Sequence, residues 1–403
     1  MLEVDLPKIS FMPIATRLNA RHNSTTISQA LSGRIPSLDG LRAVAVLLVI
    51  FNHLEVSHAP QGRGVLTFFV LSGFLITWTL LRESERCGNV SIRDFYIRRG
   101  LRIFPAFYIF AVLHLAVTWL MQGKLSASAW ADYATAFFYV GNYRHAISPH
   151  LHQYLGHTWA LSIEEQFYFL WPWLLSSFQK DLRRLTHILI TIIVAADIYR
   201  IVLFFKFHVA RTWLNFSFES RLDHLLVGCL LAVMLKRGVL SHFWEFMTSG
   251  IWISLVTFGL IVVSIALDAH YGLAYKYGIT FVIDPLLTAI LLVQVIAFAK
   301  TWAWGWLNWS VTRYVGRISY SMFLYQGVTN YWAVHIFKNR SRFVVVAVAV
   351  SLALLLGSIS YYAVELSFLR LKAKFVRGSS KPCQKPVTTL VSRPGVEVAS
   401  VNA

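Results

Sequence analysis

Two ionisable side chains lie inside the first long apolar stretch of this sequence. Residues 35–54 read IPSLDGLRAVAVLLVIFNHL, and Arg42 and His53 stand 11 residues apart within them. On an α-helix this spacing returns both side chains to within roughly 20° of one face, with about 16 Å between them along the axis. Ionisable groups in an apolar helix are costly and usually face a cavity or a partner. We therefore expect this helix to direct Arg42 and His53 into one interior at two depths; a snorkelling arginine and a capped histidine are the alternative.

A pair of carboxylates follows in a later apolar run, HTWALSIEEQFYFLWPW. Glu164 and Glu165 come seven and eight residues after His157, or roughly 10–12 Å along a helix. Adjacent helical residues point about 100° apart, so at most one of them faces an interior squarely. We expect one of these two carboxylates to lie with His53 in the outer half of the membrane. A carboxylate there would raise the basicity of the imidazole and fix its tautomer.

An arginine cluster lies in the segment FYIRRGLRIFPAFY, at the predicted start of the third apolar helix. Arg99 and Arg102 stand one turn apart on one helix face, and Arg98 precedes them. Guanidinium groups at a helix N-terminus form a good phosphate site, because fork-shaped donors and the helix dipole act together. Anchoring of the helix at the cytoplasmic surface is the alternative.

Further polar residues mark the opposite membrane face. The run RLDHLLVG is predicted to place Arg221, Asp223 and His224 at an outer mouth where a polar substrate would enter. We add Trp159 and Tyr168 to Arg221 and Asp223 as candidate substrate contacts. The outer histidines His145, His150, His152 and His157 have no carboxylate or cysteine at ligand spacing, so we expect no metal.

The composition identifies the class of protein that carries these residues. The chain has 403 residues, 56% of them hydrophobic and 14% charged, and its mean hydropathy is +0.56. Soluble domains are nearer one quarter charged. The net charge of +18 comes from short loops between apolar runs, which is typical of membrane topology and not of a nucleic-acid surface.

The hydropathy pattern predicts an all-α, polytopic membrane bundle of about ten transmembrane helices. Windows of spanning length are listed here in order: 38–56, 64–81, 103–121, 158–175, 187–206, 222–235, 251–267, 278–299, 318–337 and 343–366. The lysine and arginine bias predicts that both termini and the loop 82–102 are cytoplasmic, although Lys338, Arg340 and Arg342 oppose it. Residues 1–35 and 371–403 are polar and are expected to be disordered cytoplasmic segments.

Six motifs together resemble the acyltransferase-3 family of integral-membrane O-acyltransferases. They are SLDGLRAVAV, RGVLTFFVLSGFLI, RRGLRIFPAFY, HTWALSIEEQFYFLWP, RLDHLLVG and GRISYSMFLY, and they occur in the family's order. The resemblance implies one transmembrane acyltransferase domain over residues 36–370. It also implies that His53 is the essential histidine with Arg42 as its partner, that Arg99 and Arg102 bind acyl-CoA, and that Glu164 is the acidic position of the fourth helix. The sequence departs from the family at Ala160, at Gln326 and at Leu66–Thr67.

This resemblance implies acyl transfer from cytoplasmic acyl-CoA, acetyl-CoA first, to a hydroxyl of a carbohydrate or glycoconjugate outside a bacterial inner membrane. The donor is a substrate, and no permanently bound cofactor is expected. We expect direct transfer with His53 as base, since the sequence has no Gly-x-Ser-x-Gly elbow. The alternatives are an acceptor such as a macrolide or a lipid, and a proton-coupled transporter, although the two halves of the chain show no repeat. The sequence leaves the oligomeric state open.

Overall fold

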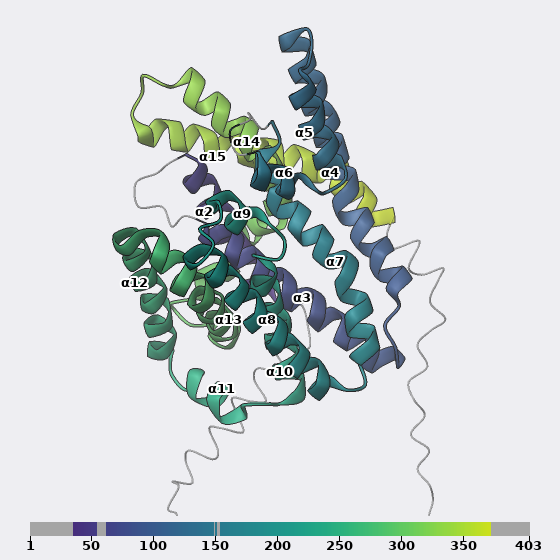
Figure 1. The fold of residues 1–403 in the computed structure, drawn as a ribbon, viewed down its shortest axis with the longest axis vertical. Helices are drawn as coiled ribbons and strands as arrows, with labels where there is room; N and C mark the ends of the chain where they lie inside the picture. The colour runs from purple at the N-terminus through teal and green to yellow at the C-terminus, as the bar shows by residue number, and fades with distance from the viewer. Residues whose placement is uncertain (1–34, 55–61, 149, 151–153, 372–403) are drawn as a thin grey trace, which may run out of the picture.

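The computed structural model describes residues 35–54, 62–148, 150 and 154–371. The predicted N-terminal segment, except for its last residue, and the tail beyond residue 371 lie outside the described residues. Within the described residues, every regular element is a helix (Figure 1). The prediction of an all-α membrane bundle is therefore confirmed.

The α-helices are α2 (Pro36–His53), α3 (Arg63–Cys87), α4 (Ile92–Gln122), α5 (Ala127–Phe137), α6 (Gly141–Ile147), α7 (Trp159–Phe178), α8 (Leu182–Phe205), α9 (Arg211–Phe216), α10 (Leu222–Arg237), α11 (Ser241–Met247), α12 (Ile251–Tyr275), α13 (Phe281–Ala297), α14 (Ser310–Ile336) and α15 (Arg342–Ser360). Short 3₁₀ or π segments join or extend them: η1 (Gly156–Thr158), η2 (Lys276–Thr280), η3 (Gly305–Asn308) and η4 (Tyr361–Glu365).

Each of the ten predicted windows falls on one of these helices. In the described part of the chain, 5 helical stretches are long and apolar enough to cross a membrane, or up to 6 if the pair α10 and α11, bent by 110°, is one span. The remaining windows fall on helices that carry more polar residues, such as α2 with Asp39 and Arg42. The chain is a multi-pass membrane protein.

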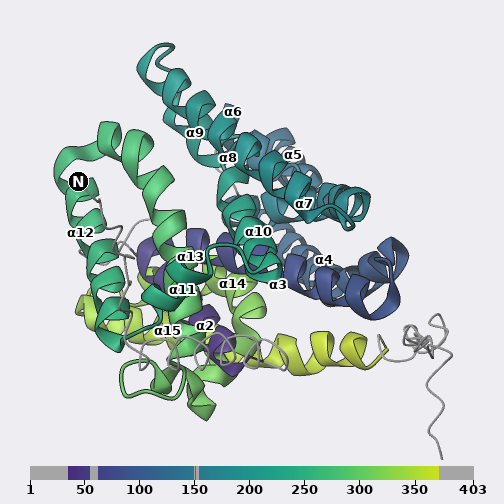
Figure 2. The same ribbon diagram turned by 90° about the horizontal axis from the view of Figure 1, so that it is seen from below.

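The stretch Ile251–Ala297 meets the length criterion as one unit but folds as two helices. Gly272 has φ 67° and ψ −145°, which breaks the helical path. Only glycine adopts this conformation without strain. Helix α12 therefore turns back and packs against α13, as the windows 251–267 and 278–299 predicted (Figure 2).

Helix α3 is central to the bundle. Of its most apolar 18-residue window 72% is buried, against 11% for α8, and α12 and α4 lie on opposite flanks in both views (Figures 1 and 2). Helices α3 and α10 approach through glycines: a Cβ on Gly73 would lie 2.0 Å from the carbonyl oxygen of Leu225, and one on Gly228 would lie 2.1 Å from that of Val70. Small residues allow such close contact between membrane helices.

The predicted basic loop 82–102 is mostly helical. Helix α3 continues to Cys87 and α4 begins at Ile92, because the Ser91 side chain caps α4 by accepting a hydrogen bond from the Asp94 amide. Arg98, Arg99 and Arg102 therefore lie in the second and third turns of α4. The expected contribution of the helix N-terminus to their anion binding is wrong, because that end lies about two turns away.

Candidate active site

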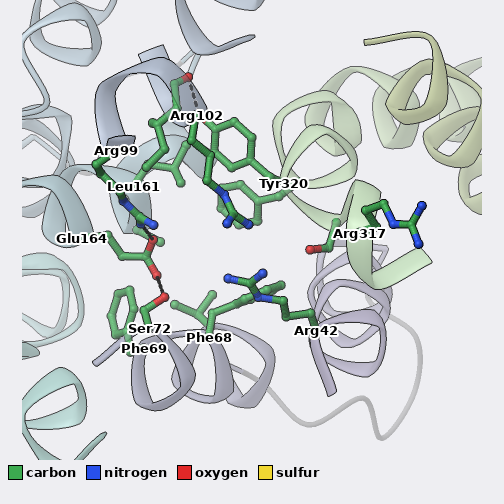
Figure 3. A pocket seen from close by; sticks show the side chains of 15 residues that line it. Arg42, Phe68, Phe69, Ser72, Arg99, Arg102, Leu161, Glu164, Arg317 and Tyr320 are labelled. Carbon is green, nitrogen blue, oxygen red and sulfur yellow. Dashed lines mark hydrogen bonds and ion pairs between the residues drawn. The ribbon is translucent and has the colours of Figure 1, made fainter. Parts of the chain in front are cut away.

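Four arginines from three helices, two on α4 and one each on α2 and α14, line one internal cavity. Arg42 projects from α2, and Arg99 and Arg102 project from α4 (Figure 3). The cavity has a volume of about 670 Å³, open solvent included. The other lining residues are Val65, Phe68, Phe69, Ser72, Ile103, Ala160, Leu161, Glu164, Arg317, Ser319, Tyr320 and Phe323. The sequence-predicted residues Arg42, Arg99, Arg102 and Glu164 are thus brought together.

The arginines from α2 and α4 differ in their partners. Arg99 has carboxylate oxygens of Glu164 and Glu165 3.8 Å from its nitrogens, and its guanidinium carbon lies 3.7 Å from the centre of the Tyr168 ring. Within the described residues, Arg42 and Arg102 have no hydrogen bond and no carboxylate within 4.0 Å. Buried cations are stable only when an opposite charge or solvent compensates them. The guanidinium groups of Arg42 and Arg102 are therefore available to an anion that enters this cavity.

A second cavity meets the same arginines. It has a volume of about 1230 Å³, open solvent included, and Arg42, Arg99 and Arg102 line it as well. Its further lining residues include Asp39, Trp78, Arg82 and Arg98. Arg98, a predicted donor-binding residue, donates at 2.5 Å to Glu83. The arginines thus stand where the two cavities adjoin, so one elongated anionic ligand can contact both.

Only one of the two adjacent glutamates faces the first cavity. Glu164 lines it, whereas Glu165 lines a separate cavity on the flank of α4 and α7, with Phe104 and Tyr139. The hydroxyl of Ser72 donates a 2.9 Å hydrogen bond to Glu164 (Figure 3). Thr67 and Thr79 on the same helix donate instead to carbonyl oxygens four residues earlier. Of these three side chains on α3, Ser72 is the one whose hydroxyl donates to another helix instead of to its own backbone.

The expected contact between Glu164 and His53 is absent from the described residues. His53 is exposed at the last position of α2 and lines neither the first nor the second cavity. Its Nδ1–H donates at 2.8 Å to the carbonyl oxygen of Val49. Glu164 lies instead with Arg99, because a carboxylate in an apolar bundle is stabilised best by a cation. Arg42 is likewise about 16 Å from His53 along the helix axis and belongs to the arginine cluster.

The His53 ring nevertheless has a defined protonation pattern. A carbonyl oxygen can only accept, so Nδ1 carries the proton in the neutral ring and Nε2 keeps a lone pair. His157 lies close enough to His53 for their charges to interact, and its Nε2–H donates at 2.9 Å to the carbonyl oxygen of Leu324. Phe323 lines the first cavity and also contacts the His157 ring, with 6.2 Å between ring centres. Phe323 thus stands between the cavity and the outer histidines.

The predicted substrate contacts separate into different environments. Asp223 is 2% exposed and accepts from Arg200 at 3.0 Å and from the His224 ring at 3.0 Å, so it does not form an open mouth. Arg200 also pairs with Asp197, three residues before it on α8. Tyr168 lies under Arg99 in the arginine cluster and not at the outer face. Buried charge neutralisation explains why these side chains turn inward.

Trp159 and Arg221 remain close to each other. The Arg221 guanidinium carbon lies 5.8 Å from the centre of the Trp159 ring. Trp159 begins α7 immediately after the η1 segment that holds His157. These two residues therefore lie near the outer histidines.

The outer histidines do not form a metal site in the described part of the chain, where no group of three or more His, Cys, Asp or Glu side chains could hold a metal ion. His152 lies outside the described residues. Burial lowers the pKa of His145 to about 4, so this imidazole is neutral at pH 7.

Sequence reasoning missed two charged residues near the first cavity. Arg317 lines it, although its motif GRISYSMFLY was noted only for resemblance. Glu365, in the π segment η4, is 4% exposed, accepts a hydrogen bond from Ser321, and interacts electrostatically with Arg102 and Arg42. Glu365 could have been found from the sequence, because a carboxylate within an apolar run is a signal of function.

Known proteins match the chain along most of its length. The profile of a family described as an acyltransferase domain matches residues 35–363. Peptidoglycan O-acetyltransferase OatA of Listeria monocytogenes is 29% identical over 307 residues, which cover 72% of this chain and 48% of the relative. Putative peptidoglycan O-acetyltransferase YrhL of Bacillus subtilis is 30% identical over 317 residues, with the same coverages. Putative O-acetyltransferases of Staphylococcus aureus are 27% identical over 348 residues, covering 83% of this chain and 57% of each relative.

The chain thus spans about half the length of the curated relatives it matches. No solved structure gives a significant match.

Proposed function

From the premise that the chain belongs to the acyltransferase-3 family and is a membrane acyltransferase, we propose that it transfers an acetyl group from acetyl-CoA to a hydroxyl of a glycan at the outer side of the membrane. The relatives' names support acetyl as the group and a peptidoglycan-type polymer as the acceptor. The bacterial relatives support a bacterial inner-membrane location, and the charge bias of the loops supports cytoplasmic termini.

One observation carries the donor assignment. Arg42 and Arg102 line both the first and the second cavity. Neither arginine has a carboxylate within 4.0 Å among the described residues. Guanidinium groups bind phosphate oxygens through paired, charge-assisted hydrogen bonds. The phosphates of CoA would lie against these two side chains, with its nucleotide in the cavity of about 1230 Å³ beside Trp78. Arg99 and Arg98 are already neutralised by glutamates and would add less.

The first cavity would hold the pantetheine arm of the donor. Its wall combines apolar side chains with a few polar groups, among them Ser72, Glu164 and Tyr320. The amide N–H groups of pantetheine would donate to Glu164, whose carboxylate can accept several hydrogen bonds. Arg42 and His53 are about 16 Å apart along α2, a span that an extended pantetheine arm can cover.

The acetyl transfer itself would take place at the outer end of α2. His53 Nε2 would accept the proton of the acceptor's hydroxyl while the oxygen attacks the thioester carbonyl. The C–S bond then breaks, and the leaving CoA thiolate takes the proton from the imidazolium. Phe323 would have to turn aside for the thioester to reach His53, because its ring lies between the first cavity and His157.

The experiment uses the full chain reconstituted in nanodiscs with labelled acetyl-CoA and soluble peptidoglycan fragments. We expect label in the fragments and release of free CoA, both lost in His53→Gln. The matched control is His270→Gln, an exposed histidine on α12. The proposal would be overturned in favour of a transporter if the wild-type chain consumed no acetyl-CoA and showed proton-coupled uptake in vesicles.

A further inference from the structure

A second group of cations lies at the outer end of the bundle, away from the arginine cluster. Of the three buried arginines in the described residues, Arg63 pairs with Asp268 and Asp284, and Arg200 pairs with Asp197 and Asp223. The third, Arg221, and the half-buried Lys276 have no carboxylate within 4.0 Å in the described part of the chain. This difference needs an explanation, since burying an unpaired charge is costly.

Both unpaired cations converge on one aromatic ring. The Arg221 guanidinium carbon lies 4.2 Å from the centre of the Phe281 ring, and the Lys276 ammonium lies 5.8 Å from the same centre. Arg221 is 7% exposed and uses its Nε to donate at 2.9 Å to the carbonyl oxygen of Asn215. Its two terminal nitrogens keep their donors. Arg221 and Lys276 also repel each other, so an anion between them would stabilise both.

Two buried hydroxyl groups lie in the segment that carries Lys276. Tyr277 follows Lys276 directly and is 0% exposed, and its hydroxyl lies near the Asn215 side chain and the charge of Arg221. Thr280, one helical turn further along, is 1% exposed and has a hydroxyl without a partner among the described residues. Buried polar groups without partners usually mark a missing water or ligand. Both hydroxyls can donate to the oxygens of an anion.

These residues lie on the acceptor side of the proposed reaction. Arg221 contacts Trp159, which begins α7 directly after the segment that contains His157, and His157 interacts with His53. A sugar that stacks on Trp159 with its anionic group toward Arg221 would therefore extend toward the proposed base. Aromatic faces and cationic forks are a common combination for acidic sugars.

We propose that Arg221 and Lys276 bind an anionic group of the acceptor, so that the enzyme prefers glycans that carry a carboxylate or a phosphate. A preference measured in kcat/KM rests on the proposed acetyl transfer. Binding of the acidic glycan can be measured without that reaction, because the cations form the site in the absence of the donor. Asp223 takes no part in this site, since Arg200 and His224 occupy its oxygens.

The test compares three forms of one oligosaccharide with the full chain in nanodiscs: the carboxylated form, its carboxyl-reduced alcohol, and a phosphorylated form. Binding is measured calorimetrically without acetyl-CoA, and kcat/KM is measured with it. We expect the wild type to prefer the charged forms about tenfold, and Arg221→Gln or Lys276→Gln to remove most of this preference. The carboxylated and phosphorylated forms show which anion is the better ligand.

Two matched controls keep the result interpretable. Arg184→Gln removes a guanidinium that lies 5.4 Å over the Phe178 ring, and Lys206→Gln removes an ammonium 5.8 Å over the Phe207 ring; both lie outside the cluster. Both should keep the wild-type preference. Should Arg221→Gln fail to give a monodisperse protein, the more exposed Lys276→Gln decides alone.

Equal binding of neutral and charged glycans by the wild type, or a preference that survives in Lys276→Gln, would overturn the inference. Absence of acetyl transfer with retained, Lys276-dependent binding of acidic glycan would instead overturn the proposed reaction and leave the anion site standing.

Discussion

Arg42 and His53 project from one helix but lie in different environments. Arg42 lines the two adjoining cavities, whereas His53 ends α2 with its Nδ1–H bonded to the Val49 carbonyl. Eleven helical residues separate them by about 16 Å. This spacing assigns Arg42 to the donor end and His53 to the acceptor end of the proposed path.

The first prediction concerns the donor phosphates. Arg102→Gln should raise the KM for acetyl-CoA by roughly tenfold or more, because it removes charge-assisted hydrogen bonds from a partly dehydrated site. The measurement is initial-rate kinetics with acetyl-CoA and with acetyl-pantetheine, which lacks the phosphates. Arg93→Gln, at an exposed position near the start of the same helix, is the control and should behave as wild type. An unchanged KM in Arg102→Gln would remove Arg102 from the donor site.

The second prediction separates Glu164 from His53. Since Glu164 bonds to Ser72 and lies with Arg99, Glu164→Gln should raise the KM for the donor several-fold through loss of its hydrogen-bonding partners. The acid limb of the kcat/KM profile against pH should stay where it is in the wild type. A displaced acid limb would mean that the carboxylate tunes the histidine after all. The control is Ser84→Ala. Ser84 lies on α3, as Ser72 does, and the variant removes its 2.8 Å hydrogen bond to Gln179 and so tests the loss of a hydrogen bond alone.

The third prediction concerns the packing of α3 against α10. Gly73→Ala should lower the thermal midpoint by several degrees, because its Cβ would lie 2.0 Å from a backbone oxygen that cannot move without the helix. Fluorescence-detected gel filtration after heating measures the midpoint. Gly259→Ala, where nothing lies within 4 Å of the added Cβ, should be neutral or slightly stabilising. Equal midpoints for both variants would contradict the close helix contact.

The fourth prediction tests the reassignment of Asp223. Asp223→Asn removes one of the two carboxylates that neutralise Arg200, a residue with 0% exposure, and weakens the bond to His224; it should cost about 1–3 kcal/mol of stability. The thermal midpoint should fall, whereas the KM for the acceptor measured on the folded fraction should match the wild type. A raised KM with an unchanged midpoint would return Asp223 to the substrate-binding residues.

Much of this protein could be read from one chain. Each of the ten windows that hydropathy predicted coincides with a helix, because a bilayer requires long apolar helices whatever their partners are. Adjacent-residue geometry predicted that at most one of Glu164 and Glu165 faces an interior squarely, and Glu164 alone of the two lines the first cavity. Residue type and motif order also indicated an acyltransferase, which the family match then established.

Tertiary structure decided which charges meet. Depth along a helix could be estimated from sequence, but rotation and tilt set whether Glu164 contacts His53 or Arg99, and the strong attraction of opposite charges in an apolar interior selects Arg99. The same cause turned Asp223 toward Arg200 and brought Glu365, which is far away in the sequence, near Arg42 and Arg102. Local sequence carries the chemistry of each side chain, whereas the partner of a buried charge depends on how distant helices pack.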